Sequence, residues 1–306
     1  MVTHRAAAAG SDPGPDLGTE LCGISLATPL VPAAGTLAKE ALGEVKGVYG
    51  AVLPKTVTPE ARAGNPPPRV AEVSSGMVNS IGLQNPGLDR FLEDLDDYYQ
   101  FGLPLFVSVA AETVREFAAM CERLAGEERV AAVELNLSCP NVEHGGLQFC
   151  AGPRAVREVV AACRGSLSEK PLFAKLTNEG VVANAAAAEE AGADAVTLIN
   201  TIPALVVDPH ERSVFLRGGL SGPAIKPVAL RAVYEVSRVV GVPVIGVGGV
   251  ASGIDAVEFM LAGATAVQVG AGSFVREPQE ILEEFATYLR ENGLRARELK
   301  GALAEN

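Results

Sequence analysis

The sequence predicts an α/β fold, a (β/α)8 TIM barrel in a single domain. Eight short apolar segments of strand length alternate with mostly helical segments along the 306 residues. Polar and charged residues stand where several of these segments end, and barrel enzymes place their chemistry at the C-terminal ends of their strands. An open doubly wound sheet is the alternative, but it normally begins with a glycine-rich turn that this sequence lacks.

The predicted strands are short runs dominated by Val, Leu, Ile and Ala. In chain order they are 30–36, 50–57, 103–109, 130–135, 171–177, 194–201, 243–250 and 264–270. Helical spacing of apolar residues predicts the helices 88–99, 112–124, 154–164, 184–191, 225–240, 253–261 and 278–293. We expect the connections 58–69, 76–87, 141–153 and 202–222 to be loops, and loops this long are usually functional. Segment 141–153, with its glycine pair Gly145-Gly146, resembles a mobile flap.

Composition narrows the class of protein. The formal net charge of -12 disfavours nucleic acid as the main partner. The five cysteines include no CxxC pair, which argues against a disulfide framework, a zinc site or an iron–sulfur cluster held by this chain alone, and indicates a reducing cytoplasm. No stretch approaches the roughly 20 apolar residues of a membrane span. We expect residues 1–18 to be a disordered leader and 19–306 to be the barrel.

Chemically useful residues gather at the predicted strand ends. They are Lys55, Asn136, Cys139, Lys175, Asn200, Gly248-Gly249 and Gly270. A thiol can act as a nucleophile or a base, although Cys139 alone is equally compatible with a small buried residue in a turn. A lysine at the end of a buried strand calls for an anion, because burying an ammonium is costly. The late glycines suit a phosphate site near strands seven and eight, with tight turns as the alternative.

Several segments in order carry a family resemblance. They are Lys55-Thr56, 64–69, 79–87, 136–142 with Gly145-Gly146, 174–176, Asn200-Thr201, 219–227 and 247–249. Over roughly residues 20 to 290 the chain resembles the class 1 dihydroorotate dehydrogenases, most closely the 1B subclass. That resemblance implies FMN at the top of the barrel and the oxidation of dihydroorotate to orotate in pyrimidine biosynthesis. Cys139 would remove the C5 proton while hydride passes from C6 to flavin N5.

The resemblance also implies roles for individual residues. Lys175 would stand at the N1/O2 edge of the flavin, and Lys55 near the flavin and the substrate carboxylate. The implied substrate-binding set is Lys55, Asn79, Gly82, Leu83, Asn136, Asn141, Asn200 and Thr201. The implied FMN-binding set is Ala34, Gly35, Lys55, Thr56, Asn136, Lys175, Ile199, Ser221, Gly222, Gly248, Gly249, Gly270 and Ala271.

Some positions depart from the family pattern. Ala34 and Ala271 replace hydroxyl residues that the family often has there, and Cys150-Ala151-Gly152 departs from the usual flap sequence. The first two bear on FMN affinity, and the third bears on flap closure.

Partners and alternatives follow from the same resemblance. We expect a homodimer with a partner subunit that holds FAD and a [2Fe–2S] centre and passes the electrons to NAD. Together they would form a heterotetramer. Fumarate or a quinone as acceptor would make that partner unnecessary. A related FMN dihydropyrimidine dehydrogenase-like enzyme is the second reading, and a catalytically lapsed barrel that serves as a binding subunit is the third.

Overall fold

The computed structural model of the protein describes residues 14–37, 39, 41, 43, 46–137, 149–167 and 169–304. Most of the predicted leader and the segment that contains Cys139 and Asn141 therefore lie outside the described residues. The boundary of the leader stays a prediction.

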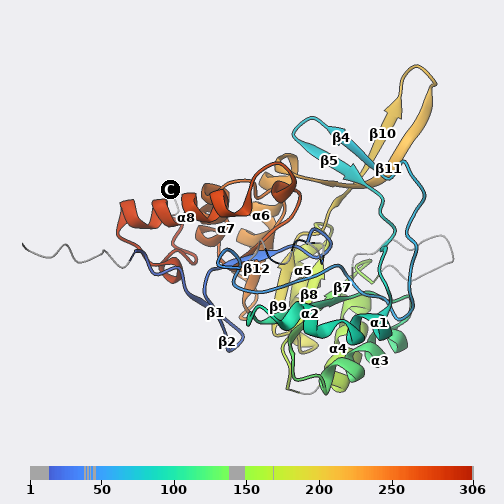
Figure 1. The fold of residues 1–306 in the computed structure, drawn as a ribbon, viewed down its shortest axis with the longest axis horizontal. Coiled ribbons are helices and arrows are strands. Elements are labelled where there is room, and N and C mark those ends of the chain that lie inside the picture. Colours follow the sequence, from blue (N-terminus) through green and yellow to red (C-terminus); the bar gives the residue numbers. More distant parts are fainter. Residues whose placement is uncertain are drawn as a thin grey trace, which may run out of the picture.

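A curled parallel sheet forms the centre of the molecule (Figure 1). Its strands run in the order β3-β13-β12-β9-β8-β7-β6. Their bounds are β3 Leu30–Pro32, β6 Leu105–Val109, β7 Val130–Asn136, β8 Leu172–Leu176, β9 Ala195–Leu198, β12 Val244–Val247 and β13 Ala264–Val269. Each falls inside or overlaps a predicted strand, so seven of the eight predicted strands are confirmed as named strands.

The remaining predicted strand, 50–57, closes the ring between the two edge strands β3 and β6. The Gly50 amide donates to the Leu30 carbonyl of β3 at 2.8 Å, and Val52 pairs in parallel with Leu105 of β6. Only isolated bridges form in this segment, because Pro54 lacks the N–H that a continuous ladder needs. The ring of eight parallel strands confirms the predicted (β/α)8 barrel.

Helices cover the outside of this ring. They are α1 Leu88–Glu93, α2 Leu95–Tyr99, α3 Val114–Ala125, α4 Pro153–Leu167, α5 Val181–Glu190, α6 Lys226–Val236, α7 Gly253–Leu261 and α8 Pro278–Asn292. The predicted helix 88–99 is two short helices, because Asp94 leaves the helical conformation with ψ 5°. Its carboxylate is held by Lys39 at 3.1 Å and Arg90 at 2.9 Å.

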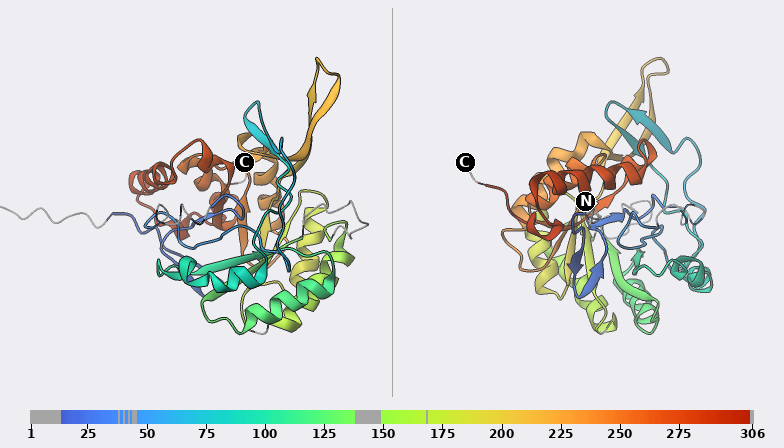
Figure 2. Two further views of the ribbon diagram at one scale, coloured as in Figure 1. Left: turned by 45° about the vertical axis from the view of Figure 1, so that its right-hand side comes forward. Right: turned by 60° about the vertical axis from the view of Figure 1, so that its left-hand side comes forward.

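Two segments predicted as loops contain strands, and that prediction is wrong. A four-stranded antiparallel sheet has the order β10-β11-β5-β4 and stands away from the barrel (Figures 1 and 2). Its bounds are β4 Val70–Val73, β5 Gly76–Asn79, β10 Ile202–Asp208 and β11 Ser213–Ser221. The glycines of β11 suggested a loop, but they allow close pairing instead, since a Cβ at Gly218 would meet the Asn79 carbonyl oxygen at 2.1 Å.

The interior of the barrel is layered. Side chains alternate along a strand, so every second residue points inward. The lowest layer is apolar, with Phe106 and Phe173 in an edge-to-face contact at 5.4 Å. A short hairpin of β1 (Thr19–Leu21) and β2 (Ile24–Leu26) adds buried Leu21 and Leu26 to this cluster. One end of the barrel is thereby sealed by apolar packing, which leaves the C-terminal strand ends for ligands.

Candidate active site

A buried polar layer lies directly above the apolar one. Two residues further along their strands, Ala132 is followed by Glu134, Phe173 by Lys175 and Ala266 by Gln268. Glu134 is fully buried, and Lys175 and Gln268 are 5% and 1% exposed. Polar side chains are rarely buried this completely unless they are bonded to one another.

The members of this layer form a connected network. Lys175 Nζ donates to Gln268 Oε1 at 2.9 Å, and Gln268 Nε2 donates to Glu134 Oε2 at 2.7 Å. The Thr197 hydroxyl of β9 also donates to Glu134 Oε2, at 3.0 Å. Lys175 Nζ lies 3.6 Å from Glu134 Oε1. The predicted strand-end lysine is therefore a buried ammonium with a carboxylate as its counter-charge.

Two predicted carboxamides meet at the mouth of the barrel. Asn200 Nδ2 donates to Asn136 Oδ1 at 3.1 Å, and Asn200 Oδ1 accepts from the Thr201 amide at 2.8 Å. Strand register brings them together, because Asn136 pairs with Lys175 and the Asn200 amide donates to the Leu176 carbonyl. Since Asn136 turns its oxygen toward Asn200, its Nδ2 points elsewhere and can donate to a flat polar ligand.

The antiparallel sheet adds Asn79 to this cluster. Asn79 Nδ2 donates to the Gly219 carbonyl at 3.3 Å. A Cβ at Gly219 would overlap the Thr201 side chain, with Oγ1 at 2.0 Å. Gly219 thus lies between Asn79 and Thr201, and residues from two sheets are brought to one place.

A second group of predicted residues surrounds the turns after β11 and β12. Gly222 and Gly249 have φ of +94° and +84°, and a Cβ at Gly249 would meet the Gly222 carbonyl oxygen at 2.9 Å and the Lys226 amide nitrogen at 2.8 Å. Gly248 has φ +124° and is buried. Backbone amides that approach this closely at the start of α6 suit an anion such as phosphate. The turns are tight, as the alternative expects, and the phosphate site stays a prediction.

An ion pair fixes the helices beside these turns. Lys226 Nζ donates to Asp255 at 2.6 Å and to Glu258 at 2.7 Å, which ties the start of α6 to α7. Burial raises the pKa of Asp255, but hydrogen bonds from Lys226 and the Ala251 amide outweigh burial, so the pKa lies below its usual value.

The remaining FMN-set residues lie at other strand ends. Ala34 and Gly35 follow β3, and Gly270 and Ala271 follow β13, where Ser273 donates its hydroxyl to the Gly270 carbonyl at 2.9 Å. Ser221 ends β11, and its hydroxyl donates to the Met77 carbonyl at 3.4 Å. Ile199 is buried in the barrel wall.

Lys55, on segment 50–57, differs from Lys175 in its exposure to solvent. Lys55 is exposed between buried neighbours, so it does not carry the burial penalty that its sequence position suggested. Thr56 is buried, and its hydroxyl shares a hydrogen bond with Ser108 at 3.0 Å inside the wall.

Gly82 and Leu83 belong to the loop that follows β5. Both have positive φ, +72° and +53°. Their immediate partners are Asn65, whose side-chain oxygen would lie 2.5 Å from a Cβ at Gly82, and Asn85, which donates to the Leu83 carbonyl at 2.7 Å. Their substrate role stays a prediction.

The catalytic candidate Cys139 and the substrate candidate Asn141 lie outside the described residues. The described chain stops at Leu137, directly after the polar layer, and resumes at Phe149. There Phe149 packs edge-to-face on Phe117 of α3 at 5.3 Å. The Cys150 carbonyl accepts from Asn184 of α5 at 3.2 Å, so the unusual flap sequence is anchored by its backbone.

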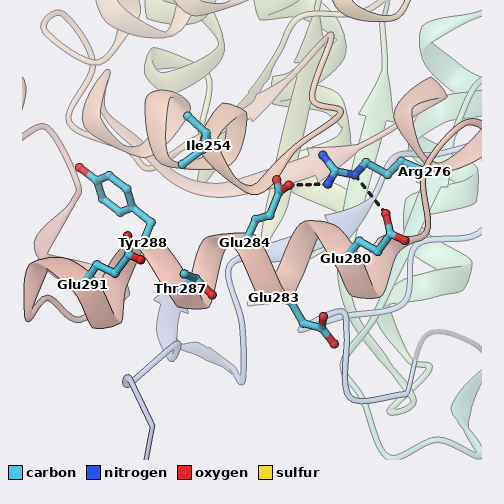
Figure 3. Close-up of a pocket in the computed structure, with 8 residues that line it drawn as sticks. All are labelled: Ile254, Arg276, Glu280, Glu283, Glu284, Thr287, Tyr288 and Glu291. Carbon is cyan, nitrogen blue, oxygen red and sulfur yellow. Dashed lines mark hydrogen bonds and ion pairs between the residues drawn. The ribbon is translucent and has the colours of Figure 1, made fainter.

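A surface pocket elsewhere carries none of the predicted site residues. It lies along α8 and is lined by Glu280, Glu284, Tyr288 and their neighbours, with Arg276 bonded to the first two (Figure 3). Within the described ranges, no group of three or more His, Cys, Asp or Glu residues could hold a metal ion. Among the described helices, none is long and apolar enough to cross a membrane.

Sequence reasoning missed the polar layer below the site. Glu134 and Gln268 stand inside apolar strands, in Val-Ala-Ala-Val-Glu-Leu-Asn and Ala-Thr-Ala-Val-Gln-Val. A single long polar residue within a fully buried strand was the available signal. Asn85 was also missed, although it orders the loop before α1 by bonding the amides of Thr58 and Gly87.

Comparison with known proteins gives a consistent result. A family model described as dihydroorotate dehydrogenase matches residues 16–289. The chain is 44% identical over 304 residues to the "Dihydroorotate dehydrogenase B (NAD(+)), catalytic subunit" of Geobacter sulfurreducens, covering 94% of this chain and 98% of that protein. Proteins of the same name from Alkaliphilus oremlandii and Anoxybacillus flavithermus are 43% and 44% identical, covering 90% and 85% of this chain and 94% and 86% of theirs.

Proposed function

The chain belongs to the dihydroorotate dehydrogenase family, and we propose that it is a cytoplasmic FMN enzyme that oxidises (S)-dihydroorotate to orotate for pyrimidine biosynthesis. One observation carries the proposal beyond the resemblance. Lys175, whose charge Glu134 balances, pairs across the strands with Asn136 at the C-terminal end of the barrel. The Asn136 carboxamide is in turn hydrogen-bonded to that of Asn200. A scaffold or binding subunit without catalysis would not need this costly arrangement.

The described residues fit FMN in two respects. The backbone around Gly222 and Gly249 is too close-packed for a Cβ, as expected where amides must reach a phosphate. Lys175 provides a buried positive charge that would favour the electron-rich form of the isoalloxazine ring. When bound, FMN supplies the acceptor for the hydride that leaves C6 of the substrate.

The asparagines suit the pyrimidine ring of the substrate. That ring alternates C=O and N–H groups, and a carboxamide offers both a donor and an acceptor. The Asn136–Asn200 bond fixes which atom of each residue faces outward, and the Asn79–Gly219 bond does the same for Asn79. Preset orientation lowers the entropy that binding must remove. Lys55, exposed at the same end of the barrel, would meet the substrate carboxylate.

Cys139 is the proposed base for the C5 proton. It stands two residues beyond Leu137, the last described residue of the strand that carries Asn136. A thiol with an ordinary pKa of about 8.5 is a modest base at neutral pH, so closure of the flap over the site should assist it by excluding water.

We further propose that the electrons pass to NAD through a partner subunit that holds FAD and a [2Fe–2S] centre. The relatives are named as catalytic subunits of NAD(+) enzymes, which implies a companion chain. The five cysteines of this chain include no CxxC pair, so a separate chain is the natural carrier of the cluster. A homodimer of this chain with two such partners gives the proposed heterotetramer.

Anaerobic spectroscopy of the purified chain tests the proposal. We expect a yellow protein whose flavin, released by denaturation, is FMN and whose visible absorbance bleaches on addition of dihydroorotate. Dihydrouracil is the matched control, because it lacks the carboxylate that Lys55 would bind. Bleaching by dihydrouracil and not by dihydroorotate would favour a dihydropyrimidine dehydrogenase-like activity, and a colourless protein that takes up no FMN would refute the proposal.

A further inference from the structure

We infer that Glu134 and Gln268 are positioning residues for Lys175: they hold its side-chain nitrogen in place beneath the flavin site. The inference rests on the proposed FMN function and extends it to two residues that do not themselves reach the mouth of the barrel. Both are buried, and Glu134 stands two residues before Asn136 on β7.

Gln268 has its amide orientation fixed by its neighbours. Its Nε2 donates to Glu134 Oε2 at 2.7 Å, and a carboxylate can only accept. The amide oxygen must therefore face the other way, where Lys175 Nζ donates to it at 2.9 Å. A flipped amide would place N–H groups against the ammonium, so the carboxylate sets the direction of the bond that holds the lysine.

Glu134 balances the charge of Lys175 without taking a hydrogen bond from it. Its Oε2 already accepts from Gln268 and Thr197, and its Oε1 lies 3.6 Å from Nζ, beyond hydrogen-bond length. Within the described structure Glu134 Oε1 is buried and accepts no hydrogen bond. The carboxylate attracts the lysine by proximity, while the neutral Gln268 makes the contact that sets its position.

This arrangement suits a lysine that must serve a ligand above it. A direct bidentate pair would draw the ammonium down toward β7 and neutralise its field. The groups of the layer that face Lys175 are the carboxylate from β7 and the carboxamide from β13, with the Thr197 hydroxyl of β9 behind the carboxylate. Removing the carboxylate leaves a buried ammonium without this counter-charge and leaves Gln268 without the acceptor that orients its amide.

The test measures the two-electron midpoint potential of bound FMN at pH 7, with the FMN dissociation constant alongside it. The variants are Glu134→Gln, Gln268→Met, Lys175→Met and the double variant Glu134→Gln with Lys175→Met. Thr265→Val is the control, since it removes a buried hydroxyl at the opposite end of the strand that carries Gln268.

Glu134→Gln should lower the potential toward that of Lys175→Met, because Gln268 loses the acceptor that fixes its amide and Lys175 is no longer held in place. The expected loss is at least tenfold in the relative stability of the reduced cofactor, which is about 30 mV for a two-electron couple. Gln268→Met keeps the carboxylate and lets it capture the lysine directly, so the potential of this variant should also be low.

The double variant decides whether Glu134 acts through Lys175. If it does, Glu134→Gln adds nothing once Lys175 is Met. Additive shifts, or potentials in both single variants equal to that of the unaltered protein, would overturn the inference while leaving the proposed function intact. A protein that binds no FMN would overturn both.

Discussion

Replacing Gly249 by alanine should separate the phosphate site from ordinary turn geometry. Gly249 has φ +84°, and an added Cβ would lie 2.7 Å from Lys226 Cβ, 2.8 Å from the Lys226 amide nitrogen and 2.9 Å from the Gly222 carbonyl oxygen. Two of these three atoms belong to the backbone, so no side-chain rotation relieves the overlap. The turn must open, and the amides proposed to hold phosphate move with it.

Two contributions make up the expected cost. A residue with a Cβ in the left-handed region costs about 1–2 kcal/mol relative to glycine. Forcing a methyl group into a close-packed site adds about 1–3 kcal/mol. If half of the second contribution, about 0.5–1.5 kcal/mol, falls on the anion-binding amides, FMN affinity drops about two- to tenfold, since 1.4 kcal/mol corresponds to a factor of ten.

Gly293→Ala provides the matched control. Gly293 follows α8 with φ +65°, and a Cβ there would meet nothing within 4 Å. This variant carries the backbone cost without the overlap, so it should lose stability and keep FMN affinity. The assays are thermal unfolding of each apoprotein and titration of the apoprotein with FMN, followed by quenching of flavin fluorescence. Equal FMN affinity in the two alanine variants would refute the reasoning.

Three further predictions concern single side chains. Cys139→Ala should reduce turnover of dihydroorotate by several orders of magnitude while FMN stays bound. Cys139→Ser should be slow and need high pH, because a hydroxyl is a far weaker acid than a thiol. Near-normal activity of the alanine variant would exclude Cys139 as the base. Asn200→Ala removes the partner that orients Asn136 and should raise the KM for dihydroorotate about tenfold or more. The FMN dissociation constant should not change. Steady-state kinetics measure the first quantity and flavin titration measures the second. Asp255→Asn should destabilise the protein by about 2 kcal/mol at pH 7, because Lys226 then loses a buried counter-charge. The folded pKa of Asp255 lies below its ordinary 3.8, so its contribution is complete above that pH and is lost as pH falls through the lower folded value. Denaturant unfolding of the unaltered protein and of Asp255→Asn between pH 2.5 and 7 should therefore show that the difference in their free energies of unfolding narrows only at the acidic end.

Local sequence determined the barrel and the positions where chemistry could stand. Short apolar runs that end at glycine or proline, and the helically spaced segments between them, are patterns of neighbouring residues. The eight strands could therefore be predicted. The strand-end rule then selected Lys175, Asn136, Asn200 and Gly249, since parallel strands of a barrel all end on one side.

Tertiary structure decided what those residues contact. Three strands of the second sheet were predicted as loops because of the glycines in their segments. The pairing of β5 with β11, which puts Asn79 beside Gly219, 140 residues away, joins the two local hairpins and is not visible in either segment alone. Glu134 and Gln268, 134 residues apart, form a bond that no local pattern specifies. Periodicity shows which way a side chain points within its own strand, whereas the choice of partner depends on register and closure of the whole barrel. The sequence therefore determined where the ammonium of Lys175 stands, and only the closed barrel determined that a carboxylate and a carboxamide hold it there.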